Sequence, residues 1–359
     1  MRSIFEHAQE QPDVILIKNG SEPFIDENFF YVTGLTTGLF EGSIAVLFPD
    51  GAVTLLVSEL EEETASTSPA NVEVYSTTEQ IHTLLHKLVA SHEHIGFNSH
   101  GITQSDFQSL TKRIDHASFL DVSEAITMTR VIKDEEELSC IRHACHIADT
   151  VMENIPNLLD GTMKEYEIAA EINYLLQKNQ ADKPAFDTIA SFGTNTSQPH
   201  YTHGSARLQK GDLALFDFGA QFHKYHSDMT RTFFYNKAED QKKEMYRVVA
   251  EAQQRGFDAI CEGVKASVVH DIVQSFIDQT QFKGRFIHST GHGLGLSVHD
   301  PGVRFSKECM VGLQENMVLT VEPGVYLPGV GGVRIEDDIR VTKNGVELLT
   351  KTSREPLII

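Results

Sequence analysis

The segment from Met317 to Asp337 reads MVLTVEPGVYLPGVGGVRIED and carries Glu322 and Glu336 on two runs that a turn-rich connection separates. Glu322 ends an apolar run that is typical of a buried strand, and Glu336 ends the run after the connection. If the runs form an antiparallel hairpin centred at Gly329, Glu322 lies directly opposite Glu336. Directly opposed residues have Cβ atoms about 4.5–5.5 Å apart. The segment therefore predicts two carboxylates side by side.

A second hairpin with the same property is predicted in residues 213–230, LALFDFGAQFHKYHSDMT. Asp217 stands in an otherwise apolar run, and the chain returns towards Asp228 after a turn. With the hairpin centred near Phe222 and His223, Asp217 faces Asp228. A bulge or a longer loop would change this register by a residue.

Opposed like charges on an apolar strand face destabilise a fold unless something positive lies between them. For one such acid, an ion pair with a nearby arginine is the ordinary explanation, and Arg231, Arg334 and Arg340 are close in sequence. For two separate pairs, divalent cations neutralise four charges more effectively. The sequence therefore predicts a metal site.

His292 lies between the two acid pairs, in the glycine-rich stretch HSTGHGLG at 288–295. Glycines there allow tight turns and let the backbone approach a ligand closely. A single histidine is more often structural than a ligand, but the glycines and the four acids favour a ligand. Oxygen-rich ligation with one imidazole suits Mn²⁺, Co²⁺ or Fe²⁺ and allows Zn²⁺, whereas the absence of thiolates argues against a cysteine-type zinc site.

Length and charge narrow the class of protein. A chain of 359 residues exceeds what one hydrophobic core usually serves, so we expect two domains. The net charge of −21 argues against nucleic acid or an anionic membrane as a partner. Solubility is the ordinary reason for most of such an acidic excess.

The cysteines and the hydropathy of the chain indicate the cellular compartment of the protein. The four cysteines form no CxxC pair, and Cys140 and Cys145 would lie roughly 140° apart on a helix, so we expect reduced thiols. The N-terminus lacks the apolar core of a signal peptide, and no run of 18 apolar residues occurs. We therefore expect a cytoplasmic protein.

The order of predicted elements indicates the fold class. In the first part, strand-like runs and helix-period stretches alternate, which suggests a small α/β domain. The strands are expected at 13–17, 43–48, 53–57 and 95–97, and the helices at 78–91 and 103–113. We place the domains at 1–125 and 126–359, with a hinge at 119–133.

Four helices are predicted in the second part. One runs from a capping box of Asp134 and Glu137 to about residue 154, and the next runs from a capping box of Thr162 and Glu165 to about residue 179. The other two are expected at about 239–261 and 268–279.

These motifs together resemble a known family. Asp217, Asp228, the triplet Gly291–Gly293, the stretch Thr320–Gly324 and the stretch Gly331–Asp337 resemble, in order and spacing, the metallopeptidases that include prolidase, aminopeptidase P and methionine aminopeptidase. The match covers about residues 130–355. It implies an α/β chain in which a small N-terminal α/β creatinase-type domain precedes an α+β pita-bread catalytic domain.

The first domain resembles the creatinase-type domain more weakly, through the stretch Asn28–Gly34, NFFYVTG. Methionine aminopeptidases lack that domain, and creatinase lacks the full set of metal ligands. The resemblance therefore implies a prolidase or aminopeptidase P, which are commonly homodimers.

Carried over to this chain, the resemblance implies two divalent metal ions, with Mn²⁺ the first expectation. It assigns Asp217 to one ion and His292 with Glu322 to the other, while Asp228 and Glu336 bridge both. Two such ions activate a shared water.

Three further roles follow from the same resemblance. Glu322 is expected to move the proton from the water to the leaving nitrogen. His200 and His299 are expected to bind the substrate carbonyl and the tetrahedral intermediate. His203, His223 and His226 are interpreted as structural or solvent-exposed histidines.

Two arginines complete the expected site. Arg334 alternates with Glu336 along its strand and is expected to support the ligands. Arg304 resembles the arginine that binds the free carboxylate of a dipeptide in some prolidases, although the loop before it has one extra residue. An exposed arginine without that role is an equal alternative.

The leading hypothesis is metal-dependent hydrolysis of Xaa-Pro dipeptides, with proline after the scissile bond. Aminopeptidase P activity on longer peptides uses the same ligands, and Arg304 is the feature that separates the two. A non-catalytic peptide-binding member of the fold is the alternative from another class, although here all five ligands are present. A hydrolase or lyase acting on a small non-peptide amide or ester is a third possibility.

Overall fold

The computed structural model describes residues 2–359, which form two compact units divided between Arg130 and Val131. The predicted boundary at 125/126 falls inside helix α6 (Ser123–Val131), and most of the expected hinge is this helix and strand β6 (Ser118–Asp121). Over the described residues, no helix combines the length and the apolar content that crossing a bilayer requires.

The first unit contains a six-stranded mixed sheet with strand order β4-β3-β2-β1-β5-β6 within residues 2–130. Its strands besides β6 are β1 (Val14–Lys18), β2 (Ile44–Leu47), β3 (Val53–Ser58), β4 (Asn71–Tyr75) and β5 (His94–Phe97). Its helices besides α6 are α1 (Arg2–His7), α2 (Glu27–Thr33), α3 (Glu62–Ala65), α4 (Thr78–Val89) and α5 (Gln104–Arg113), with a 3-10 turn at Glu59–Glu61. The predicted alternation of strands and helices is confirmed.

The core of this unit has two layers because side chains alternate along each strand. On β1, Ile15 and Ile17 pack into the cluster that contains Phe29 of α2. Val14 and Leu16 point to the other face, into the cluster formed with α4 and α5. One sheet thus separates two hydrophobic layers.

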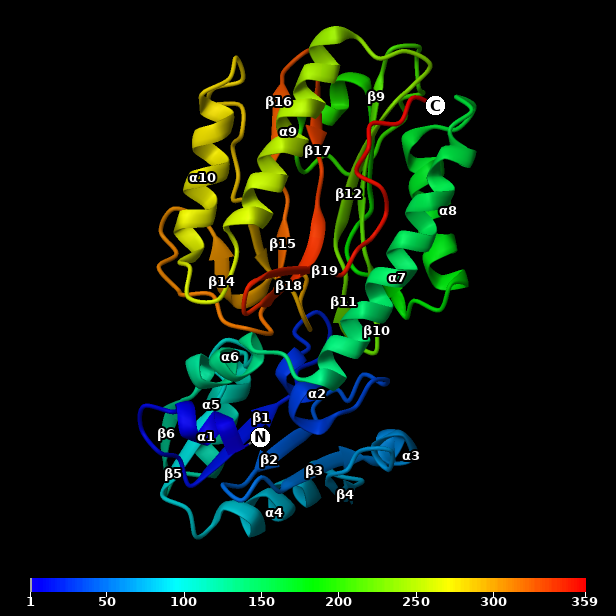
Figure 1. Ribbon diagram of the computed structural model, residues 1–359. Helices are drawn as coiled ribbons and strands as arrows, with labels where there is room; N and C mark the ends of the chain where they lie inside the picture. Colours follow the sequence, from blue (N-terminus) through cyan, green and yellow to red (C-terminus); the bar gives the residue numbers. More distant parts are fainter. Residues whose placement is uncertain (1) are drawn as a thin grey trace. The chain divides into compact units, whose positions relative to one another are not determined.

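The second unit contains several small sheets with helices packed against them (Figure 1). Strands β14-β13-β15-β18-β19 form one sheet, β12-β9-β8 another, β11-β10-β7 a third, and β16-β17 a two-stranded ribbon. The strands are β7 (Lys183–Pro184), β8 (Ile189–Phe192), β9 (Leu213–Phe218), β10 (Ala220–Phe222), β11 (Tyr225–His226), β12 (Met229–Phe234), β13 (Gly291–Gly293), β14 (Asp300–Phe305), β15 (Val318–Val321), β16 (Gly324–Leu327), β17 (Gly331–Arg334), β18 (Asp337–Thr342) and β19 (Gly345–Leu348).

Four long helices pack on these strands, and a 3-10 turn spans Gly193–Ser197. Helices α7 and α8 contact β10, β11 and β8, whereas α9 and α10 contact β17 and β14. The helices are α7 (Glu135–Leu158), α8 (Glu165–Lys178), α9 (Asp240–Ala259) and α10 (Ala266–Asp278). All four predicted helices are present.

The two predicted capping boxes have different outcomes. Asp134 and Glu137 form theirs at the start of α7, as predicted. The box of Thr162 and Glu165 is wrong, because α8 begins at Glu165, and at its N-terminus the backbone N–H of Lys164 donates to Glu167 Oε2 at 2.7 Å. Glu165 is instead fully buried, and its carboxylate is engaged elsewhere.

The hairpin register around Glu322 and Glu336 agrees with the prediction. Val321 pairs with Asp337 on one side of the two acids, and Gly324 pairs with Arg334 on the other. Both ladders keep the register of a hairpin centred at Gly329, so Glu322 and Glu336 occupy opposed positions.

The predicted register of the other hairpin is wrong. Asp217 lies opposite Thr230, not Asp228. The turn is formed by His223 and Lys224, both with positive φ, which moves its centre by one residue. Since the partner of Asp217 shifts by two positions along its strand, Asp228 still belongs to the face towards which Asp217 points.

Candidate metal centre

A buried cluster of two acids and one histidine lies where three strands meet. Asp228 precedes β12, His292 is the middle residue of β13, and Glu336 connects β17 to β18. Each offers one ligand atom, and the three atoms lie within 4.8 Å of one another. The structure thus brings together Asp228 and Glu336, which are 108 positions apart in the sequence, with His292 between them.

His292 presents Nε2 to the carboxylates. Its Nδ1 lies 3.1 Å from the carbonyl oxygen of Gly293, so Nδ1 carries the proton and donates it there. Nε2 lies 3.6 Å from Asp228 Oδ2 and 3.6 Å from Glu322 Oε1. The free lone pair therefore faces the acids. Burial, followed by the charge of His299, lowers the pKa of His292 to about 4, which keeps the ring neutral.

Asp217 combines an ion pair with an unused oxygen. Its Oδ2 pairs with Arg334, so the ordinary explanation of a buried acid holds for that atom. Its Oδ1, like Oδ1 of Asp228, is buried without a hydrogen-bond partner among the described residues. Unpaired buried carboxylate oxygens are costly, and a cation between them would remove that cost.

Burial and mutual repulsion disfavour the charged forms of these acids. Burial, then Glu336 and Asp217, raises the pKa of Asp228 well above its usual range. Burial, then Glu322 and Asp217, does the same for the pKa of Glu336. Burial raises the pKa of Glu322 to about 8, against the opposing charge of Arg334. The donor set, oxygen-rich with one neutral imidazole, fits hard divalent cations.

Arg334 and Thr230 connect the two hairpins. Arg334 Nε donates to Thr230 Oγ1 at 3.0 Å, and this hydroxyl donates to Glu336 Oε2 at 2.6 Å. Arg334 also donates to the Tyr326 hydroxyl at 3.0 Å. The predicted support by Arg334 therefore has a physical basis in its bonds to Asp217 and Thr230.

His288 is a neighbour of the site that sequence reasoning did not single out. Its Nε2 lies 2.8 Å from the Tyr326 hydroxyl, and its Nδ1 lies 3.7 Å from Glu322 Oε2. Burial, then Arg334, lowers the pKa of His288 to about 3. Its place four residues before His292 in the glycine-rich stretch was the available signal.

His299 and Arg304 lie beside His292. The rings of His292 and His299 are 4.2 Å apart and nearly perpendicular. Arg304 is the partner of His292 across β13 and β14, and the register shifts after this pair, at the loop predicted to be longer. These three residues line one cavity of about 350 Å³ together with Cys309.

His200 is exposed and lies on the segment between β8 and β9. The carbonyl of Pro199 accepts from Arg334 at 3.4 Å, which ties this segment to the site. Glu165 also holds this segment in place. The Glu165 carboxylate accepts hydrogen bonds of 2.8–2.9 Å from Phe192 N, Asn195 Nδ2, the Tyr201 hydroxyl and Gly204 N.

The other histidines that the sequence left as structural or exposed behave differently from one another. His226 is buried, and its ring contacts Gln221 and the carbonyl of Gly295. His223 forms part of the β10–β11 turn and stacks on Phe222. His203 is exposed.

A buried centre of carboxylates and one imidazole, on a unit of small sheets and four helices that follows an α/β unit in the sequence, is typical of a class of metal-dependent hydrolases. The sequence profile of metallopeptidase family M24 matches residues 139–343, and that of the creatinase/prolidase N-terminal domain matches residues 6–132. The chain belongs to metallopeptidase family M24. The predicted family, fold class and hydrolase function are thereby confirmed, and the family implies divalent metal ions.

Individual relatives refine this comparison. The chain is 38% identical over 335 residues to the Xaa-Pro dipeptidase of Pyrococcus horikoshii, covering 91% of each chain. It resembles the structure of the Xaa-Pro dipeptidase from Bacillus anthracis (TM-score 0.90, 30% identity, 100% of this chain and 98% of that one). It equally resembles the X-Pro aminopeptidase from Thermotoga maritima (TM-score 0.91, 29% identity, 97% and 98%).

Proposed function

We propose that this chain is a dinuclear-metal Xaa-Pro dipeptidase, which hydrolyses dipeptides whose second residue is proline. The observation that carries the proposal is the cluster of Asp228, His292 and Glu336, with ligand atoms within 4.8 Å. The identity of 38% to an Xaa-Pro dipeptidase supports the substrate class.

We assign the metal ligands as the family resemblance implies. Asp217 would hold one ion, His292 and Glu322 would hold the other, and Asp228 and Glu336 would be shared between them. The unpaired Oδ1 atoms of Asp217 and Asp228 support these assignments. We propose Mn²⁺ as the native metal, with Co²⁺, Fe²⁺ and Zn²⁺ as alternatives that the same donors accept.

When bound, two divalent ions lower the pKa of a shared water and stabilise negative charge on a reacting carbonyl oxygen. The chain's own residues do the rest. Glu322 accepts the proton of the water and passes it to the leaving nitrogen. His299, in ring contact with His292, and His200 donate to the substrate carbonyl oxygen.

Arg304 selects dipeptides in this proposal. It lines the cavity beside His292 and His299, and its charge acts on Glu322. A guanidinium at that position binds the free carboxylate of a dipeptide's proline, which a longer peptide lacks. Aminopeptidase activity on longer peptides is the second candidate, because the fold matches an X-Pro aminopeptidase equally well.

Turnover of two substrates tests the proposal. An Xaa-Pro dipeptide and the matching Xaa-Pro-Xaa tripeptide are compared after chelation and after addition of Mn²⁺ or Co²⁺. We expect metal-dependent cleavage of the dipeptide at a higher kcat/KM than the tripeptide. Faster tripeptide cleavage identifies the aminopeptidase, and no hydrolysis with either metal favours a peptide-binding member of the fold.

We also propose a cytoplasmic homodimer. The four cysteines are free thiols, which supports a reducing compartment. The dimer rests on the family resemblance alone. Light scattering coupled to size exclusion measures its mass, and twice 40.0 kDa is the expected result.

A further inference from the structure

The strands that carry Glu322 and Glu336 do not bond to each other at these two residues. The ladder between β15 and β18 ends at Val321, and the ladder between β16 and β17 resumes at Gly324. The interval between these two ladders contains both acids. Pro323 has no N–H to donate, so this interval lacks the regular backbone pairing of a hairpin. One long backbone hydrogen bond, from the Ile335 N–H to the Pro323 carbonyl at 3.4 Å, joins the two strands there. A further contact that bridges the strands would therefore help to fix the separation of the two acids.

The backbone N–H groups of Glu322 and Glu336 donate to neighbouring segments and not across the interval. The N–H of Glu322 donates to the carbonyl of Thr290 at 2.8 Å. The N–H of Glu336 donates to the carbonyl of Thr230 at 3.1 Å. Each acid is thus tied to the strand on its outer side, and these bonds do not hold the two acids together.

Gln253 of α9 bridges the interval from behind. Its side chain is 1% exposed, and its amide nitrogen lies 3.0 Å from the carbonyl of Val321 and 3.2 Å from that of Ile335. The same nitrogen lies 3.0 Å from Asp337 Oδ2. These acceptors immediately precede Glu322 or flank Glu336. One side-chain amide therefore joins the two strands beside both acids.

We propose that Gln253 is a positioning residue that sets the separation of Glu322 and Glu336 and thereby the geometry of the dinuclear site. This inference rests on the proposed function, because it takes both acids as metal ligands. Groups that orient metal ligands without touching the metal commonly alter affinity or activity about 10–100-fold when they are replaced.

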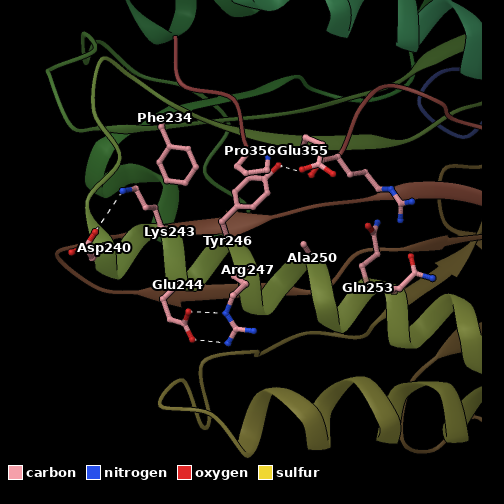
Figure 2. Close-up of a pocket in the computed structure, with 12 residues that line it drawn as sticks. Phe234, Asp240, Lys243, Glu244, Tyr246, Arg247, Ala250, Gln253, Glu355 and Pro356 are labelled. Atoms are coloured by element: carbon pink, nitrogen blue, oxygen red, sulfur yellow. Dashed lines mark hydrogen bonds and ion pairs between the residues drawn. The ribbon is translucent and has the colours of Figure 1, made fainter.

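The surroundings of Gln253 allow a clean substitution. Gln253 and Gln254 both line a cavity of about 640 Å³ between α9 and the C-terminal segment (Figure 2). Methionine has a similar length, lacks the donors and can use the neighbouring space. Gln254 is exposed and donates only to Asp258 Oδ1 at 2.8 Å, one turn along the helix, so Gln254→Met is a matched control.

The experiment measures Mn²⁺ binding to the full-length apoprotein by calorimetry and by electron paramagnetic resonance. Two Mn²⁺ ions about 3.5–4 Å apart give an exchange-coupled signal, which reports the geometry of the pair rather than the stability of the fold. In Gln253→Met we expect affinity for Mn²⁺ to fall about 10–100-fold and the coupled signal to weaken. Gln254→Met is expected to match the wild type.

Wild-type affinity and an unchanged coupled signal in Gln253→Met would overturn the inference. If this variant does not fold, Gln253→Leu, which is uncharged, smaller and also lacks the amide donors, is measured by the same criteria. Failure of the wild type itself to bind Mn²⁺ and cleave Xaa-Pro dipeptides contradicts the proposed function. Normal wild-type behaviour with unaltered Gln253 variants contradicts this inference alone.

Discussion

Substitution of Arg304 tests whether this residue gives the protein its preference for dipeptides over longer peptides. Because it lines the cavity beside His292, Arg304→Ala should remove the partner of a dipeptide's carboxylate. We expect kcat/KM for an Xaa-Pro dipeptide to fall about 10–100-fold, or about 1.4–3 kcal/mol, and that for the tripeptide to change less than about threefold. Steady-state kinetics on both substrates measures the difference.

The control for this substitution is Arg255→Ala. Arg255 lies on α9, where it pairs with Glu251, and its removal should leave both rates unchanged. Equal losses on the two substrates in Arg304→Ala would remove Arg304 from the proposed role.

Among individual residues, the acids of the candidate site could be predicted from the sequence, but not all of their hydrogen-bond and ion-pair partners could. The cluster of Asp228, His292 and Glu336 was predictable because acids on apolar strands need a counter-charge. The ion pair of Asp217 with Arg334 was one of several arginine pairings open to it, since the sequence does not say which arginine reaches it. Gln253 gave no signal, because its acceptors lie 68 and 82 residues away along the chain.

Among the elements, the His200 segment depends on one buried carboxylate at the start of α8. Glu165 accepts four hydrogen bonds from residues 192–204. Glu165→Gln replaces acceptor sites with an N–H₂ group and should displace His200. We expect kcat to fall about 10–100-fold, with little further loss when His200 is already alanine.

Asp149→Asn is the control for Glu165→Gln. Asp149 is also buried, but it accepts from Lys351 and Thr352 of the C-terminal segment. This change should lower the Tm and leave kcat unchanged. Full additivity of Glu165→Gln with His200→Ala would show that Glu165 acts on catalysis by another route.

The β10–β11 turn is strained at two residues. His223 and Lys224 have φ of 49° and 71°, which side chains other than Asn and Gly adopt reluctantly. The double change His223→Asn with Lys224→Gly should therefore stabilise the protein by about 1 kcal/mol and raise the Tm by about 2–4 °C. Thermal unfolding followed by circular dichroism measures this shift.

A lysine-to-glycine change at an exposed helical position serves as the control, because there it is expected to lower the stability. Lys243→Gly on α9 should destabilise by about 1 kcal/mol. A lower Tm in the turn variant would mean that the native side chains contribute more than the strain costs.

These turns also explain which registers were predictable. The β16–β17 hairpin turns at Gly329, so its centre is visible in the sequence. The β10–β11 turn uses His223 and Lys224, which carry no turn signature, and the predicted register was wrong. Likewise, the Thr162 and Glu165 capping pattern failed because the long-range bonds of Glu165 outcompete a local cap.

For the molecule as a whole, metal removal should make stability depend on pH. Burial raises the pKa of Asp228, Glu322 and Glu336, so the folded apoprotein binds protons more tightly than the unfolded chain. The stability linked to Glu322 is complete below about pH 4.5 and is lost as pH rises through about 8. Bound cations remove this loss.

Buried His288 and His292 have lowered pKa values, so their contribution to stability rises with pH and is complete only above about pH 6.5. Above that pH only the acids titrate, and we therefore expect the Tm in a chelator to fall by about 5–10 °C between about pH 6.5 and about pH 8, and the Tm with Mn²⁺ to change less. Scanning calorimetry measures both series. The double variant Glu322→Gln with Glu336→Gln is the control and should show a smaller dependence in the chelator. A flat apoprotein series would contradict the pKa directions.

For the domain organisation of the chain, composition and periodicity predicted an α/β unit followed by a second unit with four helices. The division between Arg130 and Val131 lies close to the expected one. The partition of the second unit into small sheets could not be predicted, because it follows from pairings such as that of β13 with β15, which are distant in sequence.

The shared register on both sides of Glu322 and Glu336 limits how the hairpin can vary in length. One residue added to a single arm, such as a glycine after Val325, turns Glu336 to the opposite face, because side chains alternate along a strand. A glycine added after Gly329 only lengthens the tip. Calorimetric titration should find Mn²⁺ binding lost in the first insertion and within about twofold of the wild type in the second. The number of residues in each arm is thus as much a part of the metal centre as the acids, and length variation is tolerable only at the tip.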